Sequence, residues 1–156
     1  MKAVRLPQIS VFNRQRKIAF DRAELEAFAR RALPSCAREK GTGLTSLPQV
    51  DVILISDRRI SELHRRFMQI EGPTDVITFQ HGEIFISIET AQRQAEAHHT
   101  LVDHELRLYL VHGLLHLQGF DDSEPTARRR MQRVQARILA GDAPKPSDRL
   151  TRCSRI

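Results

Sequence analysis

An apolar helical stretch that carries two histidines constrains this chain more than any other feature. Leucines recur at helical spacing through it, and further apolar residues widen the stripe, so the helix is expected to be almost fully buried. His112 and His116 stand four residues apart within it and therefore share one helix face. A buried imidazole needs a partner for each ring nitrogen. Ligation of a metal ion by one nitrogen and a hydrogen bond at the other meet that need.

The residues after the second histidine complete the segment HGLLHLQGFDD, residues 112–122. Gly119 is expected to end the helix, and Asp122 is a carboxylate placed where the turned chain can face the histidines again. The spacing predicts one divalent metal ion, with Zn²⁺ expected, held by His112, His116 and Asp122 and leaving a position for a reactive metal-bound water. The alternatives are two histidines satisfied at a core edge with Asp122 opening the next helix, or a ligand set completed by Asp121 or a water.

The residue directly after His112 restricts the reactions that a metal ion held by these side chains could catalyse. Zinc proteases of the HExxH type place a glutamate directly after the first histidine, as the base that activates water. Gly113 occupies that position here, so peptide hydrolysis lacks its base. A metal ion that binds a phosphate oxygen or supplies the nucleophile, with arginines neutralising charge, favours phosphodiester cleavage instead.

Charge and length narrow the class of protein. The 156 residues carry a formal net charge of +6, with basic runs at 14–17, 30–31, 58–59, 65–66 and 128–130. Such a balance favours a polyanionic partner, although a solvated arginine-rich surface is the other interpretation. We expect one catalytic domain at 1–140 and a disordered basic tail at 141–156. No run is apolar enough for a membrane span, and with only Cys36 and Cys153 the expected location is cytoplasmic.

The periodicities predict an α+β fold with about four strands and about five helices. Pro7 favours an edge position for the first strand or a break in it, and the apolar run 50–55 favours a central position. Asp21 and Asp57 are expected to cap the first two helices, and Thr100 with Asp103 to form a capping box for the histidine-bearing helix. Strands are expected at 3–12, 50–55, 75–79 and 83–87, and helices at 22–36, 58–70, 90–98, 101–118 and 126–140.

Several segments together resemble the YbeY-type endoribonucleases. HGLLHLQGFDD is similar to their HGxLHLxGxDH signature, GPTDVITF to PTDVLSF, and HGEIFIS to GDIVIS; SDRRISELHRRF and VFNRQRKIAF agree as well, so the resemblance spans about residues 10–140. It implies a small mixed sheet with the metal site at the end of a buried helix. It also implies a zinc-dependent, single-strand-specific endoribonuclease of ribosomal RNA, acting in small-subunit 3′-end maturation and ribosome quality control. The implied partners are single-stranded ribosomal RNA and the ribosome or its proteins.

Two positions depart from the family pattern. His112 and His116 match its first two ligands, but Asp122 stands where the family has a third histidine. Met68 stands where the family has a cleft arginine, and Arg65 or Arg66 is the expected replacement for RNA contact. These departures motivate a second hypothesis, a ribosome-associated assembly factor that holds a structural metal and cuts little or no RNA.

Overall fold

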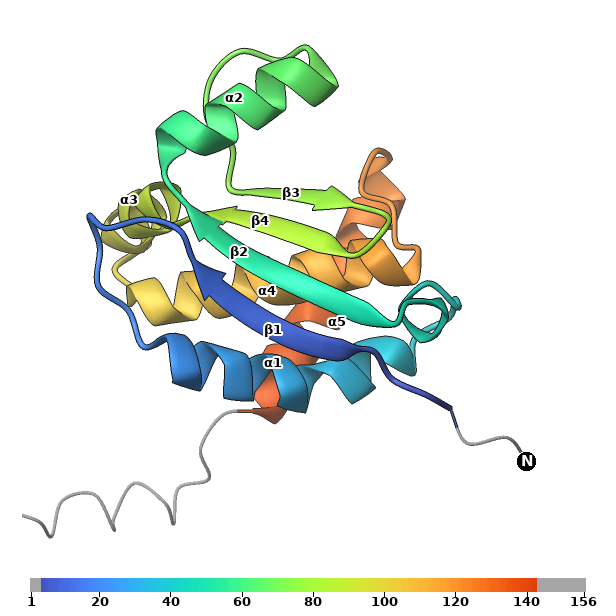
Figure 1. The fold of residues 1–156 in the computed structure, drawn as a ribbon. Helices are drawn as coiled ribbons and strands as arrows, with labels where there is room; N and C mark the ends of the chain where they lie inside the picture. The colour runs from blue at the N-terminus through green and yellow to red at the C-terminus, as the bar shows by residue number, and fades with distance from the viewer. Residues whose placement is uncertain (1–3, 143–156) are drawn as a thin grey trace, which may run out of the picture.

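The structure is a computed structural model that describes residues 4–142, and it shows one mixed sheet with helices around it (Figure 1). The predicted tail at 141–156 lies outside the described residues, apart from Gly141, which ends the last helix, and Asp142. The strands are β1 (Gln8–Asn13), β2 (Gln49–Ile55), β3 (Val76–Phe79) and β4 (Glu83–Ser87). The helices are α1 (Arg22–Ala37), α2 (Asp57–Met68), α3 (Ile88–His98), α4 (Val102–Gln118) and α5 (Pro125–Gly141), with a short 3₁₀ turn at Leu44–Ser46. The α+β expectation is confirmed.

The sheet has the strand order β1-β2-β4-β3, so β1 and β3 are its edges. β1 and β4 both pair with β2 in parallel, and β3 runs antiparallel to β4. The central position predicted for 50–55 and the edge position predicted from Pro7 are therefore confirmed. β3, the edge beside α4, is the strand that matters most for the site described below.

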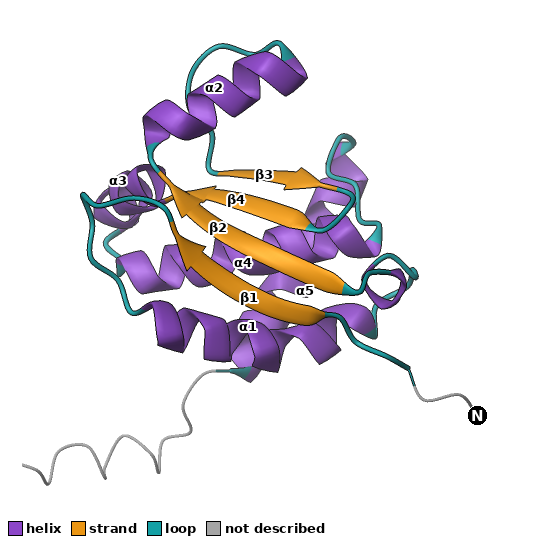
Figure 2. Ribbon diagram, viewed as in Figure 1, coloured by secondary structure: helices purple, strands orange, loops and turns teal. Residues whose placement is uncertain are grey.

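The two faces of the sheet are covered very differently. One face packs against α1 and α4, and α5 packs against these two helices; α4 is drawn behind the sheet and α1 below β1 in Figure 2. On the other face, α2 packs over β3 and β4 through Ile60 and Leu63. A row of half-buried or buried apolar side chains crosses all four strands there, namely Phe12, Ile53, Phe85 and Ile77. The first face therefore holds the main core, and the second keeps part of its apolar surface accessible.

The helix caps correct two predictions. Asp21 caps α1 as expected, because its side chain accepts from the Glu24 backbone N–H at 3.0 Å. The cap of α2 is Ser56 and not Asp57, whose carboxylate instead accepts hydrogen bonds from α3 and the end of β4. The predicted capping box is wrong as well: α4 begins after Leu101 without a side-chain cap.

Gln118 fixes the last turn of α4 to the loop that follows α1. Its buried side chain accepts from the Leu44 backbone N–H at 3.1 Å and donates to the carbonyl oxygens of Glu39 and Gly41 at 2.8 and 2.9 Å. These bonds satisfy backbone groups that would otherwise be costly to bury. The end of α4, where the two histidines lie, is thus held from the side as well as from the core.

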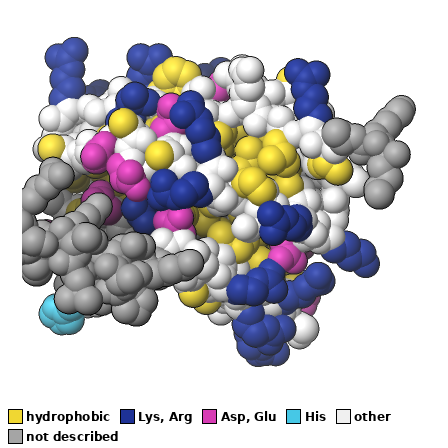
Figure 3. Space-filling view, turned by 90° about the horizontal axis from the view of Figure 1, so that it is seen from below, with side chains coloured by type: hydrophobic (Ala, Val, Ile, Leu, Met, Phe, Trp, Pro, Cys, Tyr) yellow, Lys and Arg dark blue, Asp and Glu magenta, His cyan; other side chains and the backbone are white. Residues whose placement is uncertain are grey.

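The positive charge is dispersed on the face that Figure 3 shows. Arginine and lysine side chains surround it, with acidic side chains between them and an apolar area in the middle. Within the described residues, ion pairs such as Arg31–Asp142 at 2.7 Å and Arg107–Asp142 at 3.1 Å neutralise part of the positive charge. Net charge alone therefore does not locate an RNA-binding surface on this face. Among the described residues, no helix is both long and apolar enough to cross a membrane.

Candidate metal centre

The site begins with the way α4 ends. Gly119 takes a φ of 123°, a backbone conformation that side chains with a Cβ rarely adopt. The backbone N–H groups of Gly119 and Phe120 both donate to the Leu115 carbonyl, at 3.1 and 3.0 Å, which closes the helix and turns the chain back. The turn brings the Phe120 carbonyl and the side chain of Asp122 to the histidine face of α4.

Hydrogen bonds fix the tautomer of both histidines. The His116 Nδ1 lies 3.0 Å from the Phe120 carbonyl oxygen, which can only accept, so this nitrogen carries the hydrogen. The His112 Nδ1 donates in the same way to the Gln135 side-chain oxygen at 2.6 Å. Each Nε2 is then left with a free lone pair. Burial also lowers the pKa of His112, against the opposing effect of its bond with Gln135, so the ring is neutral at pH 7 and able to act as a ligand.

The free lone pairs converge with a carboxylate oxygen. The Nε2 atoms of His112 and His116 are 2.9 Å apart, and Asp122 Oδ2 lies 3.5 Å from the first and 3.6 Å from the second. Ligands bound about 2.0–2.2 Å from one tetrahedral zinc ion are about 3.3–3.6 Å apart, which matches the two distances to Asp122. The two Nε2 atoms lie closer together than this range, at a separation that corresponds to a ligand–metal–ligand angle of about 90°. Three acceptors this close repel one another unless a cation lies between them. The donor set therefore fits a divalent metal ion.

The neighbouring carboxylate, Asp121, forms hydrogen bonds elsewhere, which argues against Asp121 as the third ligand. Asp121 accepts from the Ser123 backbone N–H at 3.0 Å and from the Ser123 hydroxyl at 2.7 Å, and these bonds lower the pKa of Asp121. α5 begins after Glu124, so Asp122 does not cap it. Asp122 is the carboxylate that faces the two histidines, and the three side chains could hold a metal ion together.

Gly113 lies where α4 comes closest to the sheet. A Cβ on this residue would lie 2.6 Å from Ile84 Cγ2 and 3.0 Å from Ile84 Cδ1, and Ile84 is fully buried. A glutamate at this position would have to enter the α4–β4 interface. The packing thus accounts for the missing protease base, and it excludes the HExxH chemistry in this arrangement.

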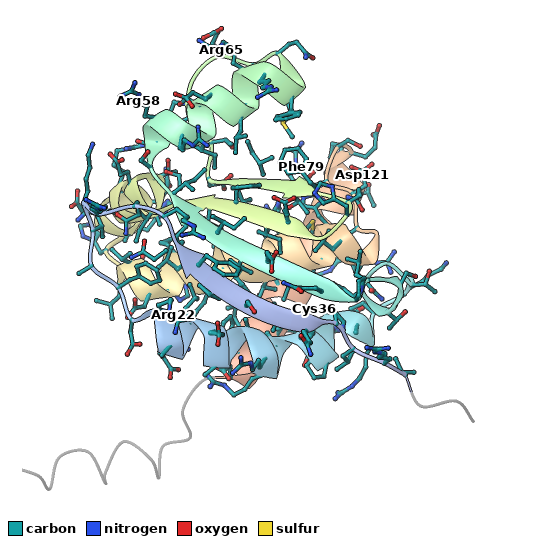
Figure 4. The ribbon with its side chains drawn as sticks, in the orientation of Figure 1. Arg22, Cys36, Arg58, Arg65, Phe79 and Asp121 are labelled. Atoms are coloured by element: carbon teal, nitrogen blue, oxygen red, sulfur yellow. The ribbon has the colours of Figure 1, made fainter. Side chains whose placement is uncertain are left out.

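The structure places Arg65, one of the two arginines predicted to contact RNA, away from the candidate metal ligands. Arg65 extends from the outer side of α2, whereas Asp121 is drawn near the end of β3 (Figure 4). Arg65 and Arg66 lie in the exposed last turn of α2, and Met68 is 43% exposed beside them. Arg128 approaches the metal ligands instead: its Nε donates to the Asp122 carbonyl oxygen at 3.2 Å.

Sequence reasoning missed Gln135 and Arg128. Gln135 had a detectable signal, because it is a polar residue within the buried stripe of α5, between Val134 and Ile138. Arg128 belongs to the basic run 128–130, but its position in the sequence does not show that it lies in the first turn of α5, next to Asp122. The role of the Phe120 carbonyl is a backbone effect that side-chain patterns do not reveal.

Sequence comparisons with known proteins agree on one family, and a comparison of structures agrees on the fold. The sequence profile described as "Endoribonuclease YbeY" matches residues 10–141. Two proteins named "Endoribonuclease YbeY" are similar to this chain: that of Gluconobacter oxydans, 35% identical over 73% of this chain and 71% of its own length, and that of Thermus thermophilus, 38% identical over 71% and 86%. The solution structure of TM1509 from Thermotoga maritima shares the fold, with a TM-score of 0.58 and 24% identity over 85% of this chain and 87% of that protein.

Proposed function

Because the chain belongs to the YbeY endoribonuclease family, we propose that it is a metal-dependent endoribonuclease that cuts single-stranded RNA. The observation that carries the proposal is the convergence of His112 Nε2, His116 Nε2 and Asp122 Oδ2 within 3.6 Å of one another. Zn²⁺ is the proposed ion, since two imidazoles and one carboxylate with an open fourth position form a donor set typical of catalytic zinc. Ribosomal RNA, in particular the 3′ end of the small-subunit RNA, is the proposed substrate.

The cellular role follows from the same family. We propose that the protein acts in the cytoplasm, on or near ribosomes, in ribosomal RNA maturation and ribosome quality control. Its partners there are single-stranded ribosomal RNA and ribosomal proteins. The net charge of +6 supports a polyanionic partner of this kind.

The residues around the ligands suit hydrolysis of a phosphodiester. A divalent ion bound there supplies Lewis acidity toward a phosphate oxygen and makes water more acidic. Gln135 and the Phe120 carbonyl hold the two imidazoles in the ligating tautomer. Arg128, exposed at the start of α5, is placed to contact the negative phosphate beside Asp122. Gly113 leaves no side chain that could act as the base of a peptidase.

One observation favours a second candidate. Met68 carries no charge where the resemblance implies an arginine, and Arg65 is directed away from the ligands. A protein that binds ribosomal RNA and holds a metal structurally, without cutting, would need no arginine at position 68 and no contact between Arg65 and the scissile phosphate. The experiment below separates this assembly factor from the nuclease.

The test is single-turnover cleavage of a 5′-labelled single-stranded RNA by zinc-loaded protein, with the metal content measured on the same sample. We expect cleavage that a chelator abolishes and added Zn²⁺ restores. His116→Ala and Asp122→Ala should lose at least about tenfold in metal affinity and in the cleavage rate. His98→Ala, which changes an exposed histidine of α3, is the matched control and should retain both.

Two results would contradict the nuclease. Folded, zinc-loaded protein that binds the RNA and leaves it intact would favour the assembly factor. Cleavage that persists unchanged in His116→Ala would place the active site elsewhere in the chain.

A further inference from the structure

Four aromatic rings form a connected group on the sheet face opposite α4. The Phe79 ring lies at its centre, edge-on to Phe67 at a centroid distance of 5.1 Å and to Phe85 at 5.8 Å, and stacked with the His81 imidazole at 5.9 Å. We name these four residues the aromatic cluster. The Phe67 residue is 51% exposed and the His81 side chain 67% exposed, so both ends of the cluster face solvent.

The cluster continues into an exposed apolar patch. Five large hydrophobic residues of the described chain are strongly exposed, and three of them lie at the end of α2 or within two residues after it, namely Phe67, Met68 and Ile70. A scattered exposed residue needs no explanation, but a contiguous patch marks a surface that binds something. The end of α2 is therefore the part of the described surface where exposed apolar side chains gather and where a ligand is best sought.

Charge indicates the chemistry of that ligand. Arg58 and Arg59 share the carboxylate of Glu62, at 3.9 and 3.0 Å, whereas within residues 4–142 no carboxylate pairs with Arg65 or Arg66. The Arg66 guanidinium lies 5.4 Å from the centre of the Phe67 ring. Exposed aromatic rings beside uncompensated arginines are the combination that binds single-stranded nucleic acid, the rings stacking on bases and the arginines contacting phosphates.

The edge strand β3 connects this surface to the metal ligands. Thr78 faces α4, because it pairs with Ile84, whose side chain packs on Gly113 beside His112. Phe79, the next residue, faces the opposite side of the sheet together with Phe85. In Figure 4, Phe79 and Asp121 are drawn toward the same end of the molecule. The aromatic cluster and the metal ligands thus flank one sheet edge from opposite faces.

We propose that the aromatic cluster binds unpaired bases of the RNA, which stack on Phe67 and His81 while Arg66 contacts a neighbouring phosphate. This inference rests on the proposed function and adds a substrate subsite to it. The RNA strand passes over the free edge of β3, with its bases on the cluster on one side and the scissile phosphate at the metal ligands on the other. A duplex, whose bases are already stacked and paired, offers no free base face to the cluster, which gives a physical origin for selection of single strands.

The first test measures binding without cleavage. His116→Ala protein, which should leave RNA uncut, is titrated with a short fluorescein-labelled single-stranded RNA and followed by anisotropy. Adding Phe67→Leu or His81→Ala should weaken binding by about tenfold each, as expected for the loss of one stacked base. Phe12→Leu is the matched control, because Phe12 lies on the same sheet face but on the far edge strand and also has an arginine, Arg14, over its ring at 5.7 Å. It should change binding less than about twofold.

The second test asks whether the loss comes from stacking. RNAs with single abasic positions are bound by the parent protein and by its Phe67→Leu derivative. Stacking predicts that, at one abasic position, the substitution no longer weakens binding, because the base it would have contacted is gone. Equal weakening at every abasic position would overturn the proposal, as would equal weakening by Phe12→Leu.

The outcomes distinguish this inference from the proposed function. If wild-type protein cuts the RNA and the Phe67→Leu and His81→Ala proteins bind and cut it equally well, the subsite is wrong and the nuclease stands. If wild-type protein neither binds nor cuts, the proposed function fails. Sedimentation of the wild-type and Phe67→Leu proteins tests whether a second copy of the chain binds the patch instead. A wild-type dimer that becomes a monomer in Phe67→Leu would make the patch a protein interface and overturn the proposal.

Discussion

Helices α4 and α2 differ sharply in how firmly the fold holds them. Ten residues of α4 are buried, and the helix contacts α1, α3, α5 and the strands β3 and β4. Ile60 is the one buried residue of α2, which contacts β4 and α3. The proposed metal ligands lie on the first helix and the proposed base-binding surface on the second. The proposed metal ligands thus lie on the more buried helix of this pair, and the proposed base-binding surface lies on the less buried one.

Packing of this kind has a direct energetic meaning. Ligand atoms must stay within a few tenths of an ångström to share one ion, and a helix surrounded by core provides that precision. A helix with few buried contacts opens locally at a lower free energy than the rest of the domain and can adjust to a flexible strand of RNA. The predictions below test this contrast, beginning with the largest expected effect.

Gly113→Glu should destabilise the protein most. The new side chain would enter the contact between α4 and Ile84 and place a carboxylate in an apolar interface. We expect a loss of about 4 kcal/mol or more in the free energy of unfolding, measured by urea denaturation, or failure to fold. Because the proposed metal ligands depend on the fixed position of α4, metal binding should be lost together with stability.

Gly113→Ala provides the graded version of the same test. It adds one methyl group, and although alanine favours helix, overlap with Ile84 should leave a net loss of about 1–2 kcal/mol. Combining it with Ile84→Ala should show a coupling of at least about 0.5 kcal/mol, since the removed atoms are those that the methyl group meets. If the losses of the two substitutions simply add, α4 moves away from the sheet at little cost in free energy. The difference in how firmly α4 and α2 are held would then be smaller than their burial indicates.

Gln135→Leu should weaken metal binding without removing a ligand. The substitution deletes the acceptor for the His112 Nδ1–H, so the ring loses its fixed tautomer and orientation. We expect Zn²⁺ affinity to fall by about 10–100-fold, measured by competition with a fluorescent chelator. Gln132→Leu, an exposed glutamine on the same helix, is the matched control and should keep the wild-type affinity. An unchanged affinity in Gln135→Leu would show that packing of α4 alone orients the imidazole.

The sequence predicted α4 and its surroundings well because the constraints there are periodic and local. Four-residue spacing put His112 and His116 on one face, and the glycine at 119 set the turn that returns Asp122 to them. Strand order was accessible in part, since the apolar run of β2 implied burial on both faces. All of these follow from short-range rules that tertiary contacts reinforce.

The parts that could not be predicted depend on contacts between distant segments. Gln118 satisfies a loop about 75 residues earlier in the chain, as its bond to Leu44 shows, and no local pattern marks that partner. Asp57 was expected as a helix cap, but its carboxylate is drawn to α3, and Ser56 caps the helix instead. The aromatic cluster joins residues of α2, β3 and β4 that become neighbours only through the sheet register.

Asp57→Asn should loosen α2 in a pH-dependent way. Partial burial by itself raises the pKa of Asp57, but hydrogen bonds from Arg93, Ser87 and Thr90 outweigh it and hold the pKa below its usual range. The carboxylate therefore stabilises the fold above its unfolded pKa of about 3.9, and this contribution disappears as the pH falls through the lower folded pKa.

We expect Asp57→Asn to cost about 1–2 kcal/mol at pH 7 and progressively less as the pH falls below the unfolded pKa of about 3.9, measured by urea denaturation at each pH. Hydrogen exchange should locate the loss in α2 and α3 rather than in α4. Glu62→Gln, which breaks only exposed ion pairs of α2, should cost less than about 0.5 kcal/mol at any pH. A pH-independent loss in Asp57→Asn would assign the effect to packing instead of charge.

Met68→Arg should have the smallest effect on stability and yet affect function. Met68 is 43% exposed at the end of α2, so the free energy of unfolding should change by less than about 0.5 kcal/mol. If the end of α2 is the RNA-facing surface, an added cation there should raise RNA affinity severalfold and steepen its salt dependence by about 0.7 in the log–log slope. Leu101→Arg adds the same charge at an exposed apolar position before α4 and controls for net charge. An equal gain in RNA affinity from both substitutions would mean that RNA responds to the overall charge of the protein. The end of α2 would then not be the RNA-binding surface.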